Sequence, residues 1–423
     1  MARDFFTPVD LRFYPRRITA ILNNLHRSQP DGISIVMCWH QLEAIGAPRN
    51  AEDAAVRASL QRDFDEILTT VASLPSLQKV KLSLSPKDGR GIRVHTAEVV
   101  ARLLNRFPKK IKSLTFTEAI LEGTFSDFVE ALSYQESLTT IRLQNVSPTP
   151  TDQSQGVPAL LSAAASLPRL EHFEFSSGPL TFIADNPSAI ADALGSLGRS
   201  PTLTHLDLNG CCSYRNCDIL IPLIQALGDS EFRLVTLNLG GCTPGYKKAR
   251  LYQSVGHMLQ ANDTLQLLSL PYTREDDTCI LPVIHSLKAN RSLKGLEFVE
   301  NDREDQVRLG EGVCTSLHGV LREYNYTLRM IVFPDLSNYK SFLSCEFYLR
   351  LNREKELRLL RNPNHPSTRE DWVRALLEHK FHLSTVYFFL RMNPLLVANP
   401  TCAAFSNVED HDVSHRLKRR KFE

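Results

Sequence analysis

The chain has 423 residues and a formal net charge of +2. This length exceeds the roughly 250 to 300 residues at which a single globular core stops growing, a limit that a repeat architecture escapes because each unit buries its apolar face only against its neighbours. The nearly balanced charge excludes a global field that would steer the whole molecule to nucleic acid or to an anionic membrane. Any electrostatic recognition is therefore expected to be local.

Cysteine usage and hydropathy predict the compartment. Nine cysteines, an odd number, are irregularly spaced, and no apolar signal segment lies near Met1. We therefore expect free thiols in the reducing interior of a cell, in the cytoplasm or the nucleus. No window approaches 18 uninterrupted apolar residues, so we expect no membrane-spanning segment.

Residues 1–76 are expected to form an N-terminal helical cap. Helical periodicity is present at 16–27 and again at 53–74. Between them, the run 33–39 reads as a strand and predicts a degenerate first repeat. A cap is needed because a stack of repeats otherwise exposes apolar surface at its ends.

A six-residue phrase then recurs nine times: an aliphatic residue, two free positions, an apolar residue, one free position and a third apolar residue. The nine phrases are Leu77–Leu82, Ile111–Phe116, Leu138–Leu143, Leu170–Phe175, Leu203–Leu208, Leu234–Leu239, Leu265–Leu270, Leu293–Phe298 and Leu328–Phe333. Their first residues advance by 27 to 35 positions. This period suits one strand plus one helix.

Segments of helical period separate the phrases, as at Ile190, Leu194 and Leu197. Connections between parallel strands are right-handed crossovers, which place the strands side by side and the helices outside. We therefore predict an α/β fold for residues 77–337: a right-handed solenoid, or horseshoe, with the parallel sheet on the concave face and helices on the convex face.

The phrase resembles the leucine-rich repeat consensus, and the period near 31 with full helices is similar to the ribonuclease-inhibitor-like class. Cys211, Cys242 and Asn301 stand where this family places a side chain that caps the turn after the strand. Less regular turns are expected at the positions that depart from this preference, which are Ser85, Ala119, Val146, Gly178, Thr273 and Leu336.

After the last phrase the period becomes purely helical, which predicts a C-terminal helical cap over residues 338–395. Phe347–Arg353 and Val386–Pro394 resemble the helical extension of uncharacterised algal leucine-rich repeat proteins. Residues 396–423 have no periodicity and are expected to be disordered. Their basic run is either a solubilising terminus or a nuclear address, and it comprises Lys418, Arg419, Arg420 and Lys421.

In this family the free positions of each phrase point into the concave face, so they form two columns across the sheet. The middle column is Lys81, Thr115, Arg142, Glu174, Asp207, Asn238, Ser269, Glu297 and Val332. The column two residues earlier is Lys79, Ser113, Thr140, His172, His205, Thr236, Leu267, Gly295 and Met330. Our candidate partner-binding residues are Lys79, Lys81, Arg142, His172, Glu174, His205, Asp207, Asn238 and Glu297.

Glu174 and Asp207 become like-charged neighbours in this arrangement, because adjacent strands lie about 4.8 Å apart. Three interpretations remain open. The face is solvated and Arg142 screens it, or a cationic group of a partner docks there, or His172 and His205 join the carboxylates around a metal ion.

Other motifs lack the residues that their chemistry requires. The glycine-rich loop at 240–247 has its lysine displaced for a phosphate-binding loop, so a repeat turn explains it. Cys211, Cys212, Cys217 and Cys242 show no CxxC pair for zinc. No serine stands in GxSxG. We therefore expect no catalytic activity and no cofactor.

The resemblance implies a non-catalytic scaffold or adaptor that binds a protein on its concave face. We expect a monomer that binds neither nucleic acid nor membrane. The alternative is a regulator of a small GTPase or of another signalling enzyme, because relatives with this repeat class include activators of small GTPases. Those relatives carry an acidic tail, whereas this chain ends in a basic one.

Overall fold

The computed structural model describes part of the chain. The described residues are 9–12, 32–38, 69, 73, 79–85, 93–94, 101, 104–105, 111–117, 120–121, 125–144, 147–148, 150–176, 187–211, 217–229, 233–242, 248–272, 278–300, 311–333 and 340–353. Several predictions lie outside them: the helix at 16–27, most of the helix at 53–74, Asn301, the C-terminal cap beyond residue 353, and the tail 396–423. The chain divides into two compact units, Met1–Leu349 and Arg350–Glu423.

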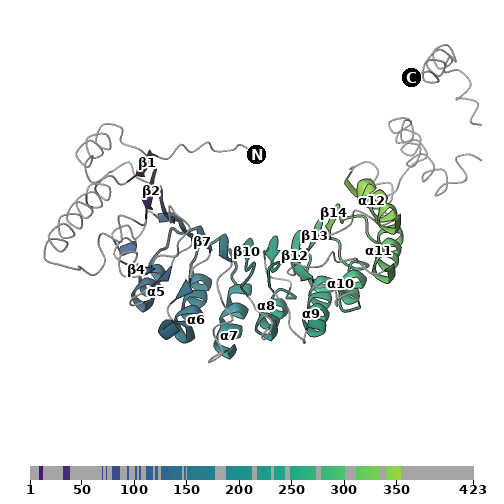
Figure 1. Ribbon diagram of the computed structural model, residues 1–423, viewed down its shortest axis with the longest axis horizontal. Coiled ribbons are helices and arrows are strands. Elements are labelled where there is room, and N and C mark those ends of the chain that lie inside the picture. The colour runs from purple at the N-terminus through teal and green to yellow at the C-terminus, as the bar shows by residue number, and fades with distance from the viewer. Residues whose placement is uncertain are drawn as a thin grey trace, which may run out of the picture. The chain divides into compact units, whose positions relative to one another are not determined.

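A single all-parallel sheet organises the first unit (Figure 1). Its eleven strands follow one another in sequence order, so that every strand between the edge strands β1 and β14 is bonded to the strands of the preceding and following repeats. The strands are β1 Val9–Arg12, β2 Gly32–Cys38, β3 Lys79–Ser85, β5 Ile111–Thr117, β7 Thr140–Gln144, β9 His172–Ser176, β10 His205–Asp207, β11 Thr236–Asn238, β12 Leu267–Tyr272, β13 Gly295–Glu300 and β14 Met330–Val332. Three short strands form a second sheet, namely β4 Arg93–Val94, β6 Ile120–Leu121 and β8 Ser147–Pro148.

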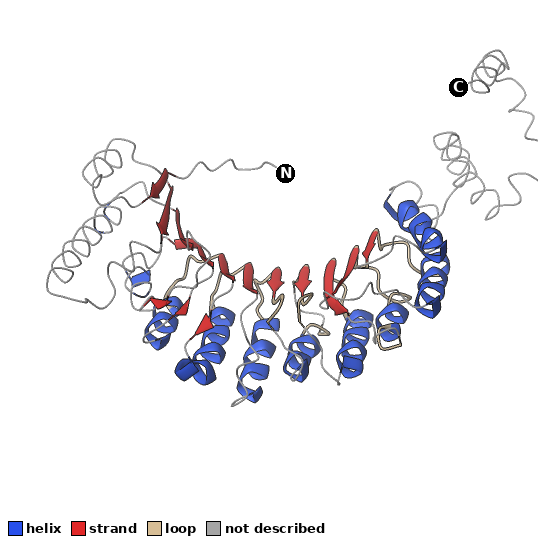
Figure 2. Cartoon of the chain, in the orientation of Figure 1, coloured by secondary structure: helices blue, strands red, loops and turns tan. Residues whose placement is uncertain are grey.

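From β5 onward a helical segment separates each strand of the large sheet from the next, and Figure 2 shows these helices on one side of the strands. They are α5 Phe125–Ser133, α6 Pro150–Ser166, α7 Pro187–Gly198, η3 Cys217–Leu220 with α8 Ile221–Ala226, α9 Lys248–Ala261, α10 Leu281–Ser286 and α11 Glu311–Glu323, followed by α12 Lys340–Arg353. Consecutive helices from α5 to α11 contact each other. The predicted alternation of strands and helices around one parallel sheet is confirmed.

The apolar positions of the phrases form the core between sheet and helices. Leu206, Leu208, Leu237 and Leu239 are each at most 1% exposed, as predicted. Side chains of a strand point alternately to its two faces, which explains why these residues are buried while those between them are not. Each such leucine contributes roughly 1.5 to 3 kcal/mol through burial.

Buried asparagines connect the later repeats, a feature that the sequence analysis missed. The Asn290 amide nitrogen donates to the Leu259 and Asn262 carbonyls, at 2.8 and 2.9 Å. Its oxygen accepts the backbone N–H groups of Ser292 and Leu293, at 3.2 and 2.8 Å. Equivalent bonds are made by Asn262 and Asn325. Each of these residues stands three positions before the first leucine of a phrase.

The predicted register is correct from β5 to β14 but wrong at the first phrase. Both columns run unbroken from Ser113 and Thr115 to Met330 and Val332. A bulge after Val80 pairs Lys81 with Ser113, whereas the prediction paired it with Thr115. The cause is the alternation of apolar residues from 80 to 84. In such a run, a shift of the strand pairing by two positions leaves every apolar residue on the face that it already occupied.

The ends of the sheet agree with the sequence in part. Strand β2 confirms the strand predicted at 33–39, while β1 was not predicted. Helix α12 confirms the start of the helix predicted after the last phrase. Among the helices of the described ranges, none is long and apolar enough to cross a bilayer.

Candidate functional site

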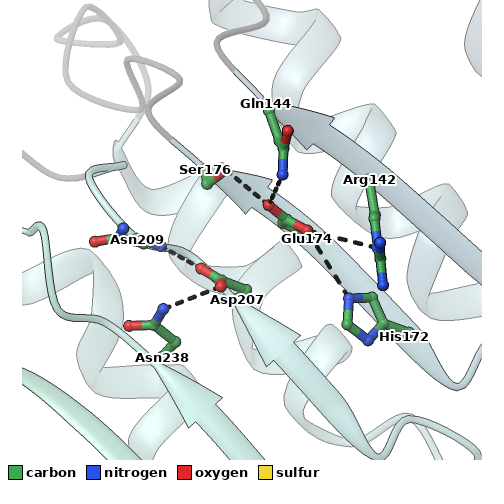
Figure 3. A network of polar contacts seen from close by, with 8 residues as sticks. All are labelled: Arg142, Gln144, His172, Glu174, Ser176, Asp207, Asn209 and Asn238. Atoms are coloured by element: carbon green, nitrogen blue, oxygen red, sulfur yellow. Dashed lines mark hydrogen bonds and ion pairs between the residues drawn. The ribbon is translucent and has the colours of Figure 1, made fainter. Parts of the chain in front are cut away.

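The two columns lie on the face of the sheet opposite the buried leucines, and we call it the open face. In β10, for example, Leu206 is buried while His205 is exposed and Asp207 is half-buried. Arg142, His172, Glu174, Asp207 and Asn238 are brought together there by β7, β9, β10 and β11 (Figure 3).

Four side chains surround the carboxylate of Glu174. Gln144 Nε2 and Ser176 Oγ donate hydrogen bonds to its Oε1, at 2.6 and 3.0 Å. Arg142 Nε and His172 Nε2 lie 3.7 and 3.9 Å from its Oε2. The Glu174 side chain is only 13% exposed, so these contacts compensate the water that the carboxylate has lost.

The carboxylate of Asp207 accepts hydrogen bonds from a different set of donors. Its Oδ1 accepts the backbone N–H of Asn209 at 2.9 Å, and its Oδ2 accepts Asn238 Nδ2–H at 3.0 Å. Burial raises the pKa of this carboxyl above its ordinary value, the two hydrogen bonds act in the opposite direction, and the charge of Glu174 raises it further. Asn238 is fixed in turn, because its Oδ1 accepts the Gly240 N–H at 2.9 Å.

The two histidines of the site stack on each other, with ring centroids 5.5 Å apart. Burial lowers the pKa of His172, as do the charges of Arg142 and His205, against an opposing effect of Glu174. His172 Nε2 is buried without a hydrogen-bond partner, since 3.9 Å to Glu174 is too long for one. We conclude that His172 is neutral near pH 7.

The metal interpretation finds no support in this geometry. Across the described ranges, no three side chains of His, Cys, Asp or Glu come together as ligands for a metal ion. The donors that surround the two carboxylates are instead amide, hydroxyl and backbone groups, which satisfy them directly.

A shallow pocket of about 190 Å³ lies beside this network on the open face. Its lining residues come from β9 to β14 and are His172, His205, Leu206, Asp207, Thr236, Asn238, Leu267, Leu268, Ser269, Gly295, Glu297 and Met330. Asp207 and Glu297 are its two carboxylates, and the lining contains no lysine or arginine. The pocket therefore has negative charge once His172 is neutral.

Apolar side chains form one wall of the pocket. Leu267 and Met330 are 42% and 47% exposed, which is high for large apolar residues. They flank Gly295, and a Cβ atom added there would lie 2.7 Å from Leu267 Cδ2 and 3.2 Å from Met330 Cε. The two side chains thus close over the glycine, and Val332, 37% exposed, extends the apolar surface.

The predicted site residues are placed as follows. Five of them form the network of Figure 3, and three of these five line the pocket together with His205 and Glu297, namely His172, Asp207 and Asn238. Glu297 also accepts a hydrogen bond from Ser269 Oγ at 2.8 Å. The backbone of β3 carries Lys79 and Lys81, but their side chains lie outside the described part of the molecule.

Sequence reasoning missed Gln144, Ser176 and Asn209. They stand two positions after the middle column, on the same face of the sheet, so extending the period-two pattern by one step would have found them. It also passed over Leu267 and Met330, although both were in a column, because only polar members were selected.

The cysteines after β10 and β11 have the structural role that the repeat pattern predicts. Cys211 Sγ donates to the Phe175 carbonyl, and Cys242 Sγ donates to the Leu208 carbonyl at 3.3 Å. Both residues are buried free thiols. Each side chain thus ties its turn to the strand of the preceding repeat.

Comparisons with known proteins do not name a family. No family model matches the chain, and no curated protein matches it. Among solved structures, "Leiomodin-1 Actin-Binding Site 2 (ABS2)" is similar with 19% identity and a TM-score of 0.31, over 42% of this chain and 92% of that one. A GH5_18 protein from Bifidobacterium longum subsp. infantis is similar with 8% identity and a TM-score of 0.20, over 78% and 94%. At these TM-scores neither likeness contributes to the argument on function.

Proposed function

We propose that this protein is a leucine-rich repeat solenoid of the ribonuclease-inhibitor-like class, a non-catalytic scaffold that binds a protein partner on its open face. The order of the strands supports the solenoid, because each repeat bonds only to the repeats before and after it. The asparagine and cysteine bonds between successive repeats support it as well.

The pocket beside Asp207 is the observation that carries the binding proposal. Its volume of about 190 Å³ is below the roughly 300 to 1,000 Å³ of sites for small ligands. It is large enough to receive one side chain of a partner. A wide sheet face with a shallow pocket is the kind of surface on which repeat proteins bind other macromolecules.

The residues that line the pocket indicate which type of partner side chain would bind in it. Lysine and arginine combine an apolar stem with a cationic end. The stem fits against Leu267 and Met330, and the cation lies within reach of Asp207 and Glu297. We therefore propose that the partner inserts a lysine or an arginine, which charge-assisted hydrogen bonds hold in the pocket.

A matched pair of variants tests the proposal. Leu267→Arg places a cation in the wall of the pocket, whereas Tyr324→Arg changes a residue of nearly equal exposure, 43%, just after α11. Proteins that bind the immobilised wild type are identified, purified, and titrated against both variants. We expect Leu267→Arg to weaken binding at least about tenfold and Tyr324→Arg to leave it unchanged. Equal affinities for both variants would contradict binding on the open face.

A further inference from the structure

A second cavity, of about 430 Å³, lies away from the open-face pocket, where the chain enters strands β5 to β11. Its lining includes the cations of Lys112, Arg169 and Arg233, together with one carboxylate, Glu171. The cavity therefore carries a net charge of +2. None of its residues lines the open-face pocket.

The three cations are available to a ligand. Arg169 and Arg233 are exposed and Lys112 is half-buried. Within the described residues, no carboxylate forms an ion pair with any of the three. Three such cations around one concavity attract anionic groups, since a cleft in which one sign of charge predominates focuses the field.

The backbone beneath the cations is rigid. The carbonyls of Thr139, Glu171 and Thr204 each accept two N–H groups from the next repeat, at 2.8 to 3.0 Å. The hydroxyls of Thr139 and Thr204 add bonds of 3.0 Å to the carbonyls of Lys112 and Glu171. A ligand that binds here meets a preorganised surface, which lowers the entropy lost on binding.

Thr202 also lines the cavity. Its hydroxyl is shielded from solvent and has no hydrogen-bond partner in the described part of the chain, which costs free energy.

We propose that this cavity binds an acidic, extended segment of a protein, with carboxylates at every third residue. The repeats that carry Lys112, Arg169 and Arg233 are two strands apart, hence about 10 Å from one to the next across the sheet, and Arg169 and Arg233 occupy equivalent positions, while Lys112 stands two positions later in its repeat. A polyproline II segment presents every third side chain on one side at intervals of about 9 Å. The interval between the repeats of Arg169 and Arg233 matches this spacing.

The lining favours a peptide over nucleic acid. Glu171 stands between the cations and repels a continuous phosphate backbone, while a peptide with spaced carboxylates leaves room for it. Single-stranded nucleic acid binds through aromatic side chains that stack on its bases, and the lining of this cavity contains none. Pro168 and Pro201 offer the apolar contact that a proline-containing peptide uses.

The probe is a labelled peptide with glutamate at every third position among prolines, titrated against the full chain by fluorescence anisotropy. We expect binding that weakens as NaCl is raised, and no binding of the same peptide with glutamine in place of glutamate. The variant Arg169→Glu/Arg233→Glu should weaken binding at least about tenfold. Lys288→Glu/Arg322→Glu, an equal change of charge on other exposed cations, should change it less than about twofold.

Several outcomes of this experiment would contradict the proposal. Equal affinity of the two charge-reversal variants, or of the glutamate and glutamine peptides, would overturn it. Tighter binding of an oligothymidylate than of the acidic peptide would also overturn it, in favour of a nucleic-acid site. The proposed open-face function does not depend on the outcome, because Leu267 and Glu297 are unchanged in these variants.

Discussion

Glu174 and Asp207 occupy paired positions on β9 and β10, yet their carboxylates take hydrogen bonds from opposite sides. Glu174 accepts from Gln144 on β7, whereas Asp207 accepts from Asn238 on β11. The repulsion expected between the two charges is therefore offset within the sheet. A cation between them is not required, and the proposed place for a partner's cation is therefore the adjacent pocket, lined by both Asp207 and Glu297.

The coupling of the two carboxylates is measurable. The charge of Glu174 raises the pKa of Asp207, so Glu174→Gln should lower that pKa, as followed by carboxyl carbon chemical shifts during an NMR titration. An unchanged pKa of Asp207 in this variant would show that the two groups do not interact.

The same raised pKa makes a prediction about stability. Because the folded-state pKa of Asp207 lies above its unfolded value, ionisation of this group disfavours the folded state at neutral pH. The free energy of unfolding that is lost in this way is regained as the pH falls from the pKa of Asp207 in the folded state to its pKa in the unfolded state. Asp207→Asn should remove this dependence from the pH profile of unfolding in denaturant. A profile identical to that of the wild type would contradict the assignment.

Burial of the central leucines predicts a large effect for Leu206→Asp. The aspartate would stand without a partner in the core, at a cost on the order of 3 kcal/mol or more. The midpoint of thermal unfolding should fall steeply. The neighbouring exposed position is the control, and His205→Asp should change the midpoint little. Similar midpoints for Leu206→Asp and the wild type would contradict the fold.

The asparagine bonds between repeats predict a similar loss for Asn290→Ala. This change leaves two carbonyls and two N–H groups without their partner. The expected loss of unfolding free energy is roughly 2 to 4 kcal/mol. Asp263→Ala, at an exposed site in the preceding repeat, should lie within about 0.5 kcal/mol of the wild type. Equal losses in the two variants would show that the buried bonds are not what stabilises the repeats.

The cysteines are expected to differ in how fast their thiols react with an alkylating reagent. Burial, together with the neighbouring Cys314, raises the pKa of the Cys345 thiol to about 12. Cys345 should therefore resist iodoacetamide in the native protein near pH 8, while the half-buried Cys279 reacts faster than Cys345. Peptide mass spectrometry before and after denaturation measures both rates. Faster labelling of Cys345 than of Cys279 in the native state would contradict the packing of α12.

The sequence sufficed for the sheet and for most of its register, because the leucine phrase specifies which residues face the core. It failed at Lys81, where alternating apolar residues permit a slip of two positions without exposing any of them. It placed Glu174 beside Asp207 correctly. It could not show that the carboxylates turn to opposite sides, since this depends on Gln144 and Asn238, which come from other repeats.

The hydrogen bonds of the buried asparagines could not be predicted from the sequence either. Asn290 lies in a polar stretch that reads as a turn, and nothing in one repeat shows that its amide reaches carbonyls of the repeat before it. The pocket, too, depends on residues from several repeats. Leu267 and Met330 become a wall only because Gly295 stands between them on the neighbouring strand.

The most direct test of the open-face proposal compares partner affinity for two neutralised variants. In Asp207→Asn/Glu297→Gln the pocket loses both carboxylates, whereas Glu174→Gln removes only a carboxylate that the sheet itself satisfies. Titration calorimetry with the purified partner should show a loss of at least about tenfold for the first variant and less than about twofold for the second. Wild-type affinity of Asp207→Asn/Glu297→Gln, with an unchanged midpoint of thermal unfolding, would contradict the binding of a partner's cation in this pocket.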